Sequence, residues 1–106
     1  MIIMLKDFFL GFVKIHILYH ASKGPVYGAE LLEELGRHGY RLSPGTLYPT
    51  LHRLAREGYL SPQRKLVAGK VRKYYAITEQ GLTALEEARK KITQLVDEVI
   101  EERLDK

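Results

Sequence analysis

The change in hydrophobic period near Gly58 is the feature that most constrains what this chain can fold into. Before it, Ser43-Pro44 is a typical helix start, because serine accepts from free amides and proline at the first helical position loses no hydrogen bond. We therefore expect a helix from Pro44 to about Glu57. Its apolar stripe is formed by Leu47, Leu51 and Leu54.

After Gly58 the apolar residues alternate, which predicts a β-hairpin with strands at 59–66 and 71–77 and a turn at 67–70. One residue in the preceding helix is unusual. Pro49 cannot donate to the Gly45 carbonyl, so we expect it to kink the helix or loosen its first turn.

Helical patterns also flank this unit. Residues 5–21 carry apolar groups on two faces, and residues 27–38 place Leu31, Leu32 and Leu35 on one side. After Thr78 the apolar positions repeat in steps of three and four, which is a short heptad pattern. The predicted fold class is mainly α with a small β-hairpin, a winged helix-turn-helix at 1–78 with a C-terminal dimerisation helix at 79–106.

Charge is distributed unevenly along the chain. Between Arg37 and Lys73 there are nine basic residues and one acid, Glu57, whereas the whole 106-residue chain has a net charge of +4. A basic centre between mildly acidic ends suits a polyanion such as double-stranded DNA. A solvated basic face without function is the alternative for Arg56 and Arg64.

The predicted DNA contacts come from the polar side of the helix at 44–57 and from the hairpin. The N-terminal half of such a helix reaches base edges in the major groove, and cations beside the hairpin tip contact the backbone. Free amides near the helix start favour a phosphate. The candidates are Ser43, Gly45, Thr46, Tyr48, Pro49, His52, Arg53, Arg56, Lys70, Arg72 and Lys73.

Four segments resemble the PadR-type transcriptional regulators: residues 24–28 (Gly-Pro-Val-Tyr-Gly), 43–54 (which contains Gly-Thr-Leu-Tyr-Pro), 57–60 and 69–81. The resemblance covers 5–85 and matches the short class with one terminal helix. It implies a twofold dimer and repression that a small molecule releases. It also implies that the Tyr48 hydroxyl reaches a phosphate. Some short members stack flat aromatic drugs on tryptophan, which this chain lacks.

We expect the terminal helix to pair with a second subunit, although docking on its own domain is an alternative. The predicted dimer residues are Phe8, Phe12, Leu85, Ala88, Ile92, Leu95, Val96 and Val99. A small aromatic or hydrophobic effector can bind where aromatic side chains meet this helix, although plain core packing is the commoner use of such aromatics. The candidate effector residues are Phe8, Phe9, Phe12, Tyr19, Ile92 and Val96.

Other functions find little support. His16 and His20 have the one-turn spacing of a metal clamp, but no third ligand is evident nearby, so we expect packing beside Phe12 and Tyr19 and no metal. No catalytic set emerges and no cofactor is expected, so the chain is not predicted to be an enzyme. Without cysteine, signal peptide or spanning segment, the expected location is cytoplasmic, with no membrane partner. A winged-helix protein-interaction module acting through the terminal helix is the alternative function.

Overall fold

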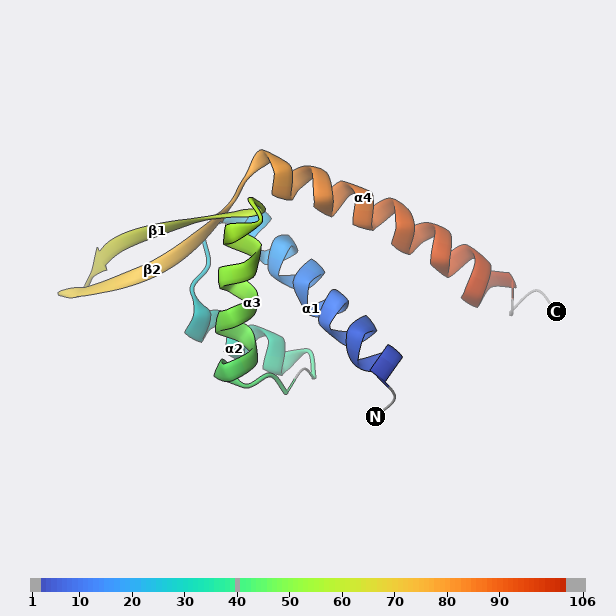
Figure 1. Cartoon of the computed structure of the whole chain (residues 1–106), viewed down its shortest axis with the longest axis horizontal. Helices are drawn as coiled ribbons and strands as arrows, with labels where there is room; N and C mark the ends of the chain where they lie inside the picture. Colours follow the sequence, from blue (N-terminus) through green and yellow to red (C-terminus); the bar gives the residue numbers. More distant parts are fainter. Residues whose placement is uncertain (1–2, 40, 103–106) are drawn as a thin grey trace.

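The computed structural model describes residues 3–39 and 41–102, so the ends of the two predicted domains, 1–2 and 103–106, lie outside the described residues. The molecule is elongated, 59 × 31 × 22 Å, with the hairpin at one end and the C-terminal helix at the other (Figure 1). The elements are α1 (Ile3–Lys23), α2 (Gly28–Arg37), α3 (Pro44–Arg56), β1 (Leu60–Val67), β2 (Lys70–Ile77), α4 (Glu79–Leu95) and the π-helical turn η1 (Val96–Glu101). The predicted fold class, mainly α with a small β-hairpin, is confirmed.

The two apolar faces of α1 have different surroundings. Val13, Ile17 and Ala21 are buried in the core, whereas Phe8 and Phe12 on the other face remain exposed. No helix of the described residues combines the length and hydropathy that crossing a bilayer requires.

Helices α2 and α3 close the core from the other side. Leu31 and Leu35 of α2 are buried, as are the three leucines of the α3 stripe, and Leu32 is partly buried, all as the spacing predicts. Helix α3 runs through Pro49 without a break. Its first turn is closed because the amides of Thr46 and Leu47 both donate to the Ser43 carbonyl, at 3.0 Å each. The predicted loosening of this turn is therefore wrong.

The hairpin is longer and tighter than predicted. Its strands pair in antiparallel register from Leu60↔Ile77 to Val67↔Lys70, so the turn has two residues, Ala68 and Gly69, instead of four. Both have positive φ, 50° and 76°, as a type I′ turn requires.

The hairpin is joined to the core of the domain at its root. Leu60 and Tyr75 are buried, and Tyr75 exchanges backbone hydrogen bonds with Val26 at 3.0 and 2.7 Å. Beyond the root, residues 61–66 of β1 are all exposed. The hairpin therefore projects from the helices as a free arm (Figure 1).

Helix α4 starts against this root and then leaves the domain. The Gly81 amide donates to the Thr78 hydroxyl, which caps the helix at 3.0 Å. Leu85 is buried in the core of its own domain, so its prediction as a dimer residue is wrong. It points back at the domain because it lies within two turns of the cap, while the apolar residues further along α4 remain exposed.

Candidate nucleic-acid interface

Helix α3 separates an apolar face from a basic one. Its buried leucines hold it to the core, and this leaves the opposite side in solvent. The exposed residues on that side include Gly45, Pro49, His52, Arg53 and Arg56. Thr46 is partly buried. The geometry therefore presents three ring or guanidinium groups that can donate hydrogen bonds, on a helix of the width that fits the major groove.

The start of α3 differs from the prediction. Ser43 occupies the N-cap position, but its side chain makes no capping bond and instead lies 3.3 Å from the Thr46 hydroxyl. The amides of Thr46 and Leu47 are already bonded to the Ser43 carbonyl. These amides are therefore not free to bind a phosphate, and what Ser43 and Thr46 offer to a ligand is their hydroxyl groups.

Tyr48 is held in place by a glycine on the neighbouring helix. A Cβ atom at Gly28 would lie only 2.3 Å from the Tyr48 ring and 2.6 Å from its hydroxyl oxygen. Since only a glycine permits this approach, Gly28 lets the Tyr48 ring lie against the start of α2.

Tyr48 and two hairpin cations line the same depression. A cavity of about 430 Å³ is lined by Tyr27, Gly28, Ala29, Tyr48, Arg72 and Lys73. It joins the first turn of α2, the middle of α3 and strand β2. Lys70 lies apart from it at the hairpin tip, fully paired in register but exposed. The predicted DNA contacts of the hairpin therefore divide into a pair in the middle of β2, Arg72 and Lys73, and a tip cation, Lys70.

Aromatic rings lie beside the cations in the middle of the hairpin, a feature that the sequence analysis did not predict. The Arg72 guanidinium lies 5.0 Å from the centre of the Tyr27 ring, and the Tyr27 ring meets Tyr74 edge-on at 5.2 Å. Lys65, opposite Arg72 in the ladder, lies 5.2 Å from the Tyr74 ring centre. Lys65 and Tyr27 are thus additional candidate interface residues. The antiparallel register of the hairpin, which places Lys65 opposite Arg72, was the signal that could have found Lys65.

A second feature lies at the opposite end of the molecule, between α1 and the last turns of α4. An apolar groove of about 450 Å³ is lined by Phe8, Gly11, Phe12, Ile15, Ile92, Leu95, Val96, Val99 and Ile100. Six of the predicted dimer residues lie there, and Gly11, Ile15 and Ile100 are additions. We call this surface the α1–α4 groove.

Besides Leu85, three predicted residues lie outside the α1–α4 groove lining. Phe9 is partly buried against the core, and Ala88 is partly buried nearer the start of α4. Tyr19 lies two turns further along α1, where the Lys23 ammonium group is 5.3 Å from its ring centre. Phe9 is turned toward the core by its position one residue after Phe8, whereas Tyr19 lies on the same side as Phe12 but beyond the end of the groove, so neither lines it in this structure. Their role in binding an effector stays a prediction.

The histidines of α1 pack as expected but have an unexpected neighbour. His16 stacks on Phe12 at 6.2 Å between ring centres, and His20 meets Tyr19 edge-on at 5.3 Å. His38, just after α2, joins them. Partial burial lowers the pKa of His16 below 6.5, and the nearby His38 and His20 lower it further. The expectation that no further ligand lies near this pair is wrong, because the turn after α2 folds back onto α1.

Comparisons with known proteins agree with this architecture. The family model of the transcriptional regulator PadR-like family matches residues 17–87. Transcriptional regulator Rv3488 of Mycobacterium tuberculosis is 47% identical over 96 residues, covering 91% of this chain and 90% of the relative. Transcriptional regulator YqjI of Escherichia coli is 37% identical over 97 residues, covering 89% of this chain and 43% of the relative.

Solved structures show the same fold. A PadR family transcriptional regulator from Eggerthella lenta superposes with a TM-score of 0.78 at 32% identity, covering 91% of this chain and 85% of that one. A PadR-like transcriptional regulator from Bacillus cereus superposes with a TM-score of 0.80 at 36% sequence identity, covering 88% of this chain and 92% of that one. Since the family match runs from α1 into α4 and the mycobacterial relative aligns over nearly the whole chain, the protein belongs to the PadR-like family of transcriptional regulators.

Proposed function

We propose that the protein is a homodimeric, sequence-specific DNA-binding repressor of cytoplasmic location. The observation that carries this proposal is the division of α3 into a leucine face buried in the core and an exposed face with His52, Arg53 and Arg56. Helix α3 then enters the major groove, because an exposed polar helix with two arginines has both the width and the donors that the groove requires.

Each part of the interface has a distinct role. Arg53 donates a bidentate pair to guanine, and Pro49 and the Thr46 methyl group contact thymine methyls. Tyr48, Arg72 and Lys73 share one depression, so they bind the same stretch of backbone. Lys70, alone at the tip, adds affinity that does not depend on sequence.

Dimerisation covers the α1–α4 groove. An apolar surface of this kind is unfavourable in water, and a second copy of the same groove closes it. Residues 79–106 then act as the dimerisation helix, and residues 1–78 as the DNA-binding unit. The two recognition helices lie about 34 Å apart, one turn of DNA. A small hydrophobic or aromatic effector enters between the subunits beside Phe8, Phe12, Ile92 and Val96, and releases the DNA by changing this spacing.

Fluorescence anisotropy with a pseudo-palindromic fragment, selected from genomic DNA by the purified protein, tests DNA binding. We expect log affinity to fall linearly and steeply as log salt rises, because each phosphate contact releases counterions. An affinity that does not change with salt would contradict the proposal. Compounds that lower the affinity for the same fragment identify effectors.

Two substitutions separate the roles within the interface. Arg53→Ala should cost about 1–3 kcal/mol on the cognate fragment and little on random DNA, because it removes a base contact. Lys70→Ala should weaken both fragments alike and reduce the salt slope by about 1. If the two variants lose the same affinity on both fragments, the assignment of roles is wrong.

The α1–α4 groove also favours a second candidate, a winged-helix module that binds another protein. In that case a hetero-complex forms, and it persists when Arg53 and Lys70 are both replaced by Ala. Formation of a homodimer whose DNA binding is lost in the same double variant favours the repressor.

A further inference from the structure

Three of the four histidines in the chain gather at one place between α1 and the end of α2. The ring centres of His16 and His38 are 5.7 Å apart, those of His20 and His38 are 6.2 Å apart, and those of His16 and His20 are 6.3 Å apart. The i,i+4 spacing on α1 places His16 and His20 on the same side of the helix. Gly39, with φ of 87°, turns the chain just beyond His38. Two helices thus contribute imidazoles to one cluster.

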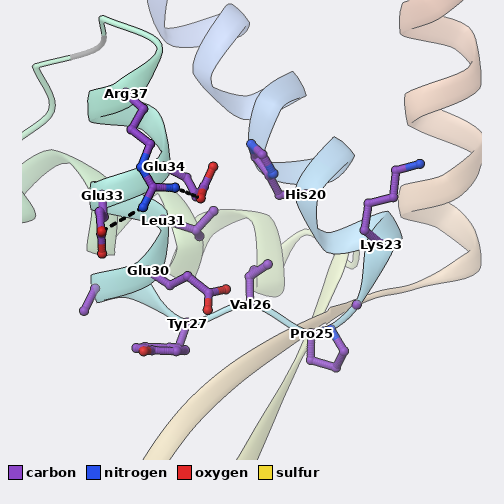
Figure 2. A pocket seen from close by; sticks show the side chains of 12 residues that line it. His20, Lys23, Pro25, Val26, Tyr27, Glu30, Leu31, Glu33, Glu34 and Arg37 are labelled. Carbon is purple, nitrogen blue, oxygen red and sulfur yellow. Dashed lines mark hydrogen bonds and ion pairs between the residues drawn. The ribbon is translucent and has the colours of Figure 1, made fainter.

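A carboxylate completes the cluster. One donor atom from each of His20, Glu34 and His38 lies within 4.8 Å of the other two. Figure 2 shows Glu34 of α2 and His20 of α1 facing each other at the edge of a cavity of about 590 Å³. This cavity gives an ion a route from solvent.

His20 gives the second observation that points to a ligand. Its Nε2 atom is buried, yet it has no hydrogen-bond partner among the described residues. A buried polar atom normally has a partner, because leaving it unpaired costs about 1–3 kcal/mol. A bound cation would satisfy this atom.

We propose that His20, Glu34 and His38, with His16 beside them, bind a divalent transition-metal ion of the Zn²⁺ class. Imidazole nitrogens and a carboxylate oxygen suit Zn²⁺ and its neighbours, and the chain has no thiolate to offer. Ligand atoms at about 2.0–2.2 Å from Zn²⁺ are about 3.4 Å apart in a tetrahedral site. The cluster therefore closes by at most about 1.4 Å around the ion, which side-chain rotation on a partly exposed surface permits.

Arg37 is the competitor for the carboxylate. It pairs with both Glu34 and Glu33, which lies 2.9 Å from its guanidinium group (Figure 2). When Glu34 turns to the metal, Arg37 keeps Glu33 as its partner. The adjacent glutamates thus provide one ligand and one counterion, and the bound metal links α1 directly to α2.

Isothermal titration of the full chain with ZnCl₂, in protein without a histidine tag, tests the site. We expect one Zn²⁺ per chain, with affinity reduced about tenfold or more in Glu34→Gln and in His38→Ala. The matched control is Glu33→Gln, which removes the other Arg37 partner and should bind Zn²⁺ like the wild type. Circular dichroism of each variant confirms folding; His38 is exposed, so its replacement should not disturb the core.

A second readout uses the link between the helices. Zn²⁺ should raise the melting temperature of the wild type and of Glu33→Gln, but not of Glu34→Gln, because a ligand that binds the folded state stabilises it. The proposal is overturned if Glu34→Gln and Glu33→Gln bind Zn²⁺ equally well. It is also overturned if His52→Ala, the remaining histidine on α3, abolishes binding.

Discussion

The two ends of the molecule both expose apolar side chains, but in different surroundings. At the hairpin tip Leu66 and Val71, 73% and 65% exposed, face each other across the ladder as one pair between cations. At the other end Phe8, Leu95, Val99 and Ile100 are exposed together along one groove. Isolated exposed residues are ordinary, whereas a continuous apolar surface marks a binding site. The comparison identifies the groove, and not the tip, as the surface that needs a partner.

The largest expected effect comes from placing a charge in the groove. Leu95→Glu should convert the dimer to a monomer, because burying an unpaired carboxylate in an apolar interface is costly. Affinity for the pseudo-palindrome should fall by about 100-fold, since each half-site is then bound separately. Light scattering after size exclusion measures the mass, and anisotropy measures the affinity.

Leu66→Glu is the matched control at the hairpin tip. It introduces the same change at a leucine of greater exposure and should leave the mass unchanged. A monomeric Leu66→Glu, or a Leu95→Glu that remains dimeric, would reverse the comparison between the two ends.

The next effect concerns the close approach of α2 and α3. Gly28→Ala should displace the Tyr48 ring and reduce DNA affinity about fivefold, equivalent to about 1 kcal/mol. Gly36→Ala is the control on the same helix, where a Cβ atom meets nothing within 4 Å. It should keep the DNA affinity and raise the free energy of unfolding by about 0.5–1 kcal/mol. If the two variants bind DNA with equal affinity, Tyr48 does not contribute to the interface.

The smallest effect tests the anchoring of Arg72 in the middle of β2. Tyr27→Leu should weaken DNA binding about two- to fivefold, because a cation–π contact near the surface contributes about 0.5–1 kcal/mol. Tyr19→Leu removes the similar contact with Lys23 within α1 and should leave DNA binding unchanged. If both variants lose the same DNA affinity, the contact between Tyr27 and Arg72 is no more important for DNA binding than the contact between Tyr19 and Lys23.

Local patterns in the sequence were sufficient to predict most elements. The leucine stripes of α2 and α3 followed from periodicity, because helices repeat with a fixed period. The change of period near Gly58 also marks the observed passage from α3 to β1. The exposed basic side of α3 is the complement of its leucine stripe, so it was predictable for the same reason.

Contacts between distant segments were not predictable in this way. The cluster of His20, Glu34 and His38 depends on how α2 folds back on α1, and the position of Tyr48 depends on a missing Cβ atom twenty residues earlier. Likewise, the heptad pattern treats Leu85 and Leu95 alike. Only the path of α4 away from the core separates a buried residue from an exposed one.

The free arm formed by β1 and β2 has a consequence for how such a chain diversifies. The bridge between Val26 and Tyr75 joins the hairpin to the core at its root. Because the outer parts of both strands are mostly exposed, their length and charge can change without repacking the core. Changes confined to a few outer residue pairs of the ladder can therefore alter the strength and salt dependence of DNA binding while the scaffold stays the same.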